Sequence, residues 1–218
     1  MNKKSIIVII LSTVLIAWVL IDFFGPWHSD LYRINSTEIA RLETDMWRAY
    51  YDKNGLLLFR LLAKMLHEHY GFPYLRSNCH AYLAARAAMV FKKGETRSDY
   101  EKALPYLENY YKGMKKIGQL NLDPKRTAAL ELEWWIVHRQ RAAEGTGALT
   151  QAIANATGDF YQVNPQILGD YAEARALAMI QRDEEAAKDG VSETEWNEIN
   201  AKLLHSYQAL SDALKKAG

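Results

Sequence analysis

Two glutamates occupy positions where a helix would present apolar side chains to a core. At about 100° per residue, Glu43 falls between Leu42 and Met46 on the apolar face of its expected helix. The same projection places Glu133 near the centre of an apolar arc that includes Val137. Both carboxylates are therefore expected to point inward.

Two arginines follow the same pattern. Arg86 is the only charged residue of segment 81–91, which is otherwise apolar or small on every side. Arg175 lies between Tyr171 and Met179 on the apolar side of a later helix. Burying either helix would therefore bury a guanidinium group.

Burying any one of these charges alone would cost several kcal/mol, so the four side chains are expected to pair with one another. Glu43 and Glu133 would accept fork-like hydrogen bonds from Arg86 and Arg175. Two interpretations stay open. One is a buried ionic network that fixes the order of the helices. The other is a polar pocket, bordered also by His138, that binds a ligand or transfers protons, although the sequence names no catalytic residue.

Metal and nucleophile signatures do not fit the same region. A di-iron bundle uses Glu-x-x-His pairs, whereas Glu133 and His138 are five positions apart. His67 and His69 project to different sides of one helix, and the lone Cys79 is of a type that usually packs. The sequence therefore predicts no metal site and no cofactor.

The charge balance argues against a nucleic-acid partner. The 218 residues include 27 Lys and Arg against 26 Asp and Glu, for a net charge of +1, and the two signs are interspersed. Nucleic-acid-binding domains instead concentrate basic residues on one face. The apolar share of 49% and the charged share of 24% are ordinary for a globular protein.

The N-terminal segment predicts a membrane anchor. Residues 5–24 read SIIVIILSTVLIAWVLIDFF, with Asp22 as the only charge, and this length suits a bilayer-spanning helix. A cleaved signal peptide is the alternative, but bulky Trp18 directly follows Ala17 and no small-x-small site lies near the end of the run. Residues 1–25 are therefore expected to remain as an anchor.

The basic residues around this run predict its orientation. Lys3 and Lys4 precede it, and no Lys or Arg follows until Arg33. The positive-inside rule then keeps the N-terminus in the cytoplasm. We expect a single-pass protein of a bacterial inner membrane, with residues 26–35 as a tether and 36–218 as an extracytoplasmic soluble domain.

Every element after the tether is expected to be a helix, which makes the fold class all-α. Helical spacing, caps and breakers recur, and sustained alternation is missing. The short connections favour a bundle of about eight antiparallel helices arranged as hairpins. The expected helices cover about 37–52, 56–70, 78–93, 99–117, 124–143, 148–161, 165–183 and 193–217, with a kink or break at Pro105.

Aromatic residues often stand in adjacent pairs, such as Tyr110 with Tyr111 and Phe160 with Tyr161. Neighbours on a helix point in different directions, so both members of a pair are not expected to face the same core. One member of each pair should reach water or line a groove, as at a partner surface or a ligand cleft.

Residues 43–51 (ETDMWRAYY) and 131–139 (ELEWWIVHR) resemble segments of bacterial, N-terminally anchored, all-helical proteins of unknown function. The resemblance implies an anchored helical domain and names no activity. Residues 78–117 are also similar to a tetratricopeptide-type hairpin. No copy follows at the same spacing, so a regular repeat array is not expected.

These patterns favour a membrane-anchored extracytoplasmic helical module that binds or assembles a protein partner, such as an envelope protein. The alternative is a membrane-tethered enzyme or small-molecule binder with a polar pocket inside the bundle, and whether the chain is an enzyme stays open. One observation separates them: the inward charges either close on one another without a void or border a cavity.

Overall fold

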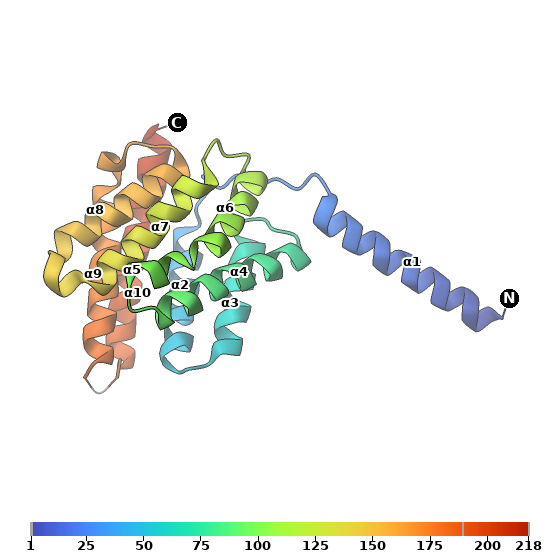
Figure 1. Cartoon of the computed structure of the whole chain (residues 1–218), viewed down its shortest axis with the longest axis horizontal. Helices are drawn as coiled ribbons and strands as arrows, with labels where there is room; N and C mark the ends of the chain where they lie inside the picture. The colour runs from blue at the N-terminus through green and yellow to red at the C-terminus, as the bar shows by residue number, and fades with distance from the viewer. Residues whose placement is uncertain (1, 189, 218) are drawn as a thin grey trace.

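The computed structural model of the chain describes residues 2–188 and 190–217, including all their side chains except those of 141–144. Within these ranges the chain forms ten α-helices, one short 3-10 helix and no strand, which confirms the all-α fold class (Figure 1). The elements are α1 Lys3–Phe24, α2 Ser36–Tyr51, α3 Gly55–Glu68, α4 Tyr74–Lys93, α5 Arg97–Glu101, α6 Leu104–Gly118, α7 Pro124–Arg139, α8 Arg141–Tyr161, η1 Pro165–Leu168, α9 Gly169–Ala186 and α10 Glu193–Ala217.

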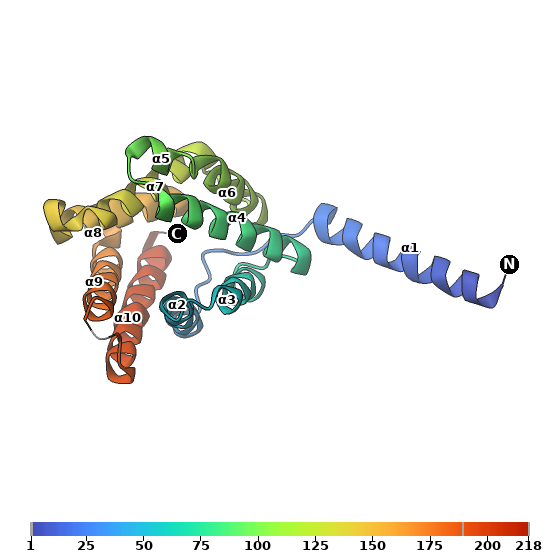
Figure 2. The same cartoon turned by 60° about the horizontal axis from the view of Figure 1, so that its bottom comes forward.

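Helices α2 to α10 pack as a closed ring. From α2 through α3, α4, α6, α7, α8 and α9 to α10, each helix contacts the next, and α10 returns to pack on α2. The short helix α5 lies beside the ring against α4 and α7. Figure 2 shows the ring, with α2, α3, α9 and α10 along its lower side. Inward-facing side chains from distant parts of the chain can therefore meet at its centre.

Polar caps fix where several of these helices begin. The side chain of Asn35 accepts a hydrogen bond from the backbone of α2, and Asn54 and Asp123 do the same for α3 and α7. Ser192 and Glu195 form a reciprocal capping box at the start of α10. These caps place the helix starts within a residue or two of the positions expected from the sequence.

The helix expected over residues 99–117 is two helices. α5 ends at Glu101 and α6 begins at Leu104, with Pro105 in its first turn. A proline has no backbone N–H to donate within a helix. In the first turn of a helix the N–H groups have no partner within the helix, so a proline is tolerated there. The chain therefore breaks just before the proline and restarts.

A second break occurs within α8 at Gly145, whose φ of 81° and ψ of 167° are not helical. This positive φ is accessible to glycine at little cost. The break lies between the two helices expected over residues 124–143 and 148–161. α7 ends at Arg139, before the expected end at residue 143, and α8 begins at Arg141, before the expected start at residue 148.

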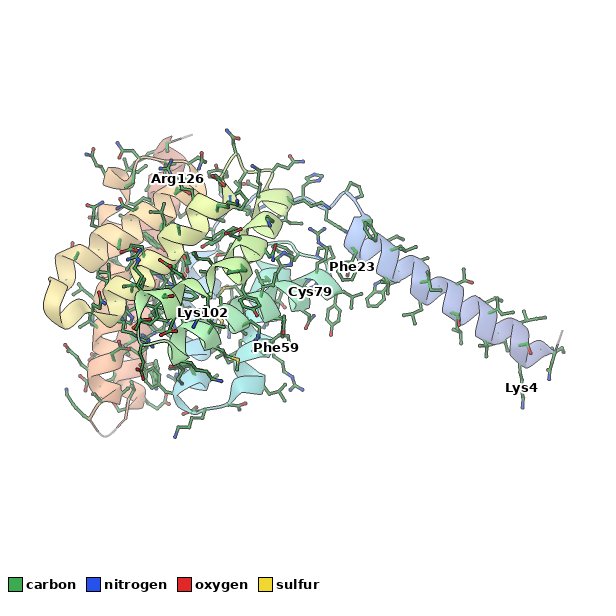
Figure 3. All side chains as sticks on the ribbon, viewed as in Figure 1. Lys4, Phe23, Phe59, Cys79, Lys102 and Arg126 are labelled. Carbon is green, nitrogen blue, oxygen red and sulfur yellow. The ribbon has the colours of Figure 1, made fainter. Side chains whose placement is uncertain are left out.

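Helix α1 is long and apolar enough to cross a membrane, with a mean hydropathy of 2.8. The helix extends away from the ring, as Figure 3 shows between Lys4 and Phe23, and its apolar side chains are largely exposed. A helix that buries little of an apolar surface within its own chain needs another apolar medium to cover it.

The charge at the end of α1 has a structural role. Asp22 is only 3% exposed, and its two carboxylate oxygens accept hydrogen bonds from the backbone N–H groups of Leu75 at 2.9 Å and Arg76 at 3.0 Å. These N–H groups belong to the first turn of α4, which has no helical partner for them. Asp22 thus caps α4 from another helix, and α4 begins at Tyr74 instead of near residue 78.

Candidate functional site

A buried ion pair joins α2 to α9 inside the ring. Arg175 donates from Nη1 to Glu43 Oε2 at 2.7 Å and from Nη2 to Glu43 Oε1 at 2.5 Å. The Glu43 and Arg175 side chains are only 7% and 15% exposed. Two of the four inward charges expected from the sequence therefore meet in the fork geometry that joins arginine to a carboxylate.

A tyrosine from α10 completes this arrangement. The Tyr207 hydroxyl donates to Glu43 Oε2 at 2.5 Å and accepts a hydrogen bond from Arg175 Nη1 at 3.0 Å. Burial alone would lower the pKa of Arg175, but the adjacent Glu43 carboxylate raises that pKa well above its usual value. Burial also raises the pKa of Tyr207. Both groups therefore keep their protons at neutral pH and act as fixed donors.

Beside this triad the ring forms a cavity of about 290 Å³ that is partly open to solvent. Seven parts of the ring contribute to its wall, from α2 to α10, and six of the lining residues are tyrosines. The lining residues are Glu43, Met46, Leu62, Met65, Tyr70, Tyr110, Tyr111, Met114, Glu131, Ala156, Thr157, Phe160, Tyr161, Tyr171, Arg175, Tyr207 and Leu210. The volume is just below the range of about 300–1,000 Å³ that is typical of small-molecule sites.

The tyrosines give the cavity a wall of hydroxyl groups and aromatic rings. Burial raises the pKa values of Tyr70, Tyr110, Tyr111 and Tyr161, so these hydroxyls stay protonated at neutral pH. Both members of the adjacent pair Tyr110 and Tyr111 line the cavity. The expectation that one member of the pair would line a groove or reach water is met by Tyr110, which is half-buried, while Tyr111 is buried.

Glu131 is the second carboxylate on the cavity wall. Its Oε2 accepts a hydrogen bond from the Tyr111 hydroxyl at 2.9 Å, and its Oε1 accepts one from Trp135 Nε1 at 3.0 Å. Within the described part of the chain it forms no ion pair. Sequence projection overlooked this residue and selected Glu133, two positions later on α7.

Two of the residues expected in the cluster lie elsewhere. Glu133 forms a surface ion pair with Arg97 at 2.7 Å, and its side chain is 43% exposed. Arg86 lies over the ring of Tyr106, with its guanidinium carbon 5.6 Å from the centroid. The prediction that Glu133 projects inward is therefore wrong, and the half-buried Arg86 does not join Glu43 and Arg175. α7 packs on α6, α8 and α5 and has no single inward side, so Glu131 faces the cavity while Glu133 pairs with Arg97 of α5 at the surface.

His138 also lies outside the cavity lining. Its Nε2 is 3.0 Å from Asp183 Oδ2, while Asp183 Oδ1 accepts hydrogen bonds from Tyr51 at 2.7 Å and from Arg182. Burial alone would raise the pKa of Asp183, but hydrogen bonding to His138 and the charge of Arg182 lower it overall. The prediction that His138 borders the pocket with Arg175 is therefore not supported, and this second cluster ties α2, α7 and α9 together.

No family model, no curated protein and no solved structure matches this chain. Among the described residues, no three His, Cys, Asp or Glu side chains gather as a metal ion would require. The functional interpretation therefore depends on the cavity and on the groups that face it.

Proposed function

We propose that this chain is a membrane-tethered binding protein whose helical ring holds a small organic molecule in the central cavity. The observation that carries the proposal is the partly open cavity inside the ring, which is bordered by Glu43, Arg175, Glu131 and six tyrosines. Ligand sites commonly combine an apolar wall with a few convergent polar groups. This arrangement corresponds to the small-molecule alternative drawn from the sequence.

A purely structural ion pair accounts for less of the geometry. Glu43 and Arg175 could stabilise the ring without any cavity beside them, whereas this cavity leaves the side chains on its wall without packing partners on one side. Small side chains such as Ala156 and Thr157 on the wall leave space that larger residues would fill. A bound molecule explains why this space is kept.

The groups around the cavity favour binding over chemical conversion. The lining tyrosines and Arg175 keep their protons at neutral pH, because burial or the neighbouring carboxylate raises their pKa values. Groups of this kind orient a ligand through fixed hydrogen bonds, whereas acid–base catalysis works best with a pKa near the working pH. These groups therefore support a binding function.

The proposal includes a location. Lys3 and Lys4 flank the start of α1, and this basic end should stay in the cytoplasm. The ring would then lie on the outer side of a bacterial inner membrane, held close to the lipid surface because Asp22 joins the end of α1 to α4. The ligand would be one that occurs outside the cytoplasm.

A pair of substitutions tests the binding function. Ala156→Phe would fill part of the cavity, whereas Ala88→Phe adds the same ring to an exposed position on α4. Native mass spectrometry of the full-length protein, purified in mild detergent, should show a bound small molecule with wild type and Ala88→Phe. Loss of this adduct in Ala156→Phe alone supports the proposal. Equal occupancy in both variants contradicts it.

A second candidate function is the partner-binding module expected from the sequence. It is favoured by the outer side of α4, where Tyr74, Tyr82 and Met89 are exposed. Because Asp22 fixes α4 to the end of α1, a protein embedded in the same membrane could reach this side. A photo-crosslinker at Tyr82, but not one at Lys188, should then give an adduct of one defined mass in intact membranes. Identical adduct patterns at the two positions would exclude this function.

A further inference from the structure

The charges on the cavity wall do not cancel. Glu43 and Glu131 carry two negative charges, and Arg175 is the one cation among the lining residues, all of which are described. Arg175 pairs with Glu43, which leaves the charge of Glu131 without compensation. From this imbalance we infer that the bound molecule is an organic cation with an ammonium group facing Glu131. The inference rests on the proposed binding function and specifies its ligand class.

Glu131 has room for a further hydrogen-bond donor. Each of its oxygens accepts one hydrogen bond, from Tyr111 and from Trp135. A carboxylate can accept about four hydrogen bonds, so about two acceptor positions stay free. An ammonium group supplies up to three donors and the opposite charge, and such charge-assisted hydrogen bonds are stronger than neutral ones.

Arg175 is not available to an anionic ligand. Its two terminal nitrogens donate to both oxygens of Glu43, and Nη1 also contacts Tyr207. An anion would have to displace this buried carboxylate and would also be repelled by Glu131. The cavity therefore selects against carboxylate and phosphate ligands.

Aromatic rings next to Glu131 provide the second feature that suits a cation. The rings of Tyr110 and Tyr111 are in edge contact, with centroids 5.3 Å apart, and Tyr111 lies 5.9 Å from Phe160. Phe160 in turn contacts Tyr161 at 4.7 Å. The face of an aromatic ring is electron-rich and attracts ammonium groups, as in aromatic cages. This continuous wall includes Tyr111, the tyrosine that donates to Glu131.

The remaining wall suits an apolar body on the same molecule. It includes Met46, Met65, Met114, Leu62 and Leu210. Methionine side chains are flexible and polarisable, so they adapt to the shape of an apolar group. The ligand should therefore be a small amine with an aromatic or aliphatic body, and not a hydrophilic polyamine.

Three probes of equal size and different charge test this ligand class. Phenethylamine carries an ammonium group at neutral pH, 2-phenylethanol is neutral, and phenylacetate is an anion. Calorimetric titration of the full-length protein in detergent should give an affinity for phenethylamine at least tenfold higher than for 2-phenylethanol. Phenylacetate should be the weakest of the three.

Matched substitutions on α7 identify the responsible carboxylate. Glu131→Gln should reduce phenethylamine affinity at least tenfold and leave 2-phenylethanol unchanged. Glu133→Gln removes the same charge two residues away, on the surface, and should change neither affinity. A Glu131→Gln variant that binds the amine as wild type does would overturn the inference.

The outcomes separate this inference from the proposed function. If phenylacetate or 2-phenylethanol binds best and Ala156→Phe abolishes that binding, the cavity is a binding site and the cationic class is wrong. If no probe binds but a small molecule is purified with the protein, its charge decides: a cation supports the inference and an anion overturns it. If nothing binds and nothing is purified with the protein, both proposals fail.

Discussion

Arg175 donates through both terminal nitrogens to both carboxylate oxygens of Glu43, a residue 132 positions earlier in the chain. The pair links α2 with α9, and Tyr207 of α10 donates to the same carboxylate. Three helices are thus held at one buried point beside the cavity. These hydrogen bonds should therefore contribute to the free energy of unfolding of the ring.

Removing the cation should destabilise the ring strongly. Arg175→Met leaves the Glu43 carboxylate buried without its partner, and breaking a buried pair in this way costs about 3–5 kcal/mol. Urea unfolding of the full-length protein in detergent, followed by tryptophan fluorescence, measures the change. A loss below about 1 kcal/mol would place the pair in a solvated environment, contrary to its burial.

The double substitution distinguishes a lost charge from lost packing. Glu43→Leu combined with Arg175→Met removes both charges, and such replacements are often neutral or stabilising. We expect the double variant to be more stable than Arg175→Met alone. If the loss of stability in the double variant equals the sum of the losses in Glu43→Leu and Arg175→Met, the two groups act independently. The paired hydrogen bonds between them would then not contribute to stability.

The Tyr207 hydroxyl should contribute measurably to the stability of the same buried cluster. Tyr207→Phe removes a donor to Glu43 and leaves part of a buried carboxylate unsatisfied, at a cost of about 1–3 kcal/mol. Tyr74→Phe is the matched control, because Tyr74 is exposed and should change stability by less than about 0.5 kcal/mol. Equal effects of the two substitutions would contradict the arrangement described for Tyr207.

Asp22 should hold the first turn of α4 in place. Asp22→Ala removes both bonds to the N–H groups of Leu75 and Arg76, and loss of a helix cap costs about 0.5–2 kcal/mol. Hydrogen exchange read by mass spectrometry should therefore accelerate in the peptide that contains these amides. The exposed Asp212→Ala should leave this peptide unchanged. Unaltered exchange in Asp22→Ala would refute the cap.

Asp183 should make stability depend on pH in acid. Its pKa in the folded protein lies below the usual 3.8, so the ionised form stabilises the fold and its contribution is complete above that value. As pH falls below about 4, this contribution should shrink by about 1.4 kcal/mol per pH unit until the lower, folded pKa is passed. Asp183→Asn should lack it at every pH.

Unfolding of wild type and Asp183→Asn, measured at several pH values between 7 and 3, tests this dependence. The difference between the two proteins should be constant at neutral pH and should narrow below about pH 4. A difference that widens in acid would mean that Asp183 is protonated more readily in the folded protein than in the unfolded chain.

The sequence predicted the helices because their signals are local. The caps Asn35, Asn54, Asp123 and Ser192 act on backbone groups within three residues, and each starts a helix in the structure. The break at Pro105 is local in the same sense. The cap that Asp22 supplies to α4 joins residues more than 50 positions apart, so no local pattern could indicate it.

Half of the predicted charge cluster was found for a related reason. Glu43 and Arg175 lie beside buried residues that a helical projection groups with them, Leu42 and Tyr171, so the projection gives their direction correctly. α7 contacts three other helices and has no single inward side, so the same projection selected Glu133 and missed Glu131. The spacing of Thr127, Glu131 and Trp135, four residues apart, is the signal that would have pointed to Glu131.

The most direct test of the central claim is the native mass of the full-length protein taken from its own membrane in mild detergent. The account predicts one adduct of a few hundred daltons at most, released on unfolding and missing from Ala156→Phe. A mass equal to that of the bare chain, together with no binding of any of the three probes, would contradict the claim that the cavity is a ligand site.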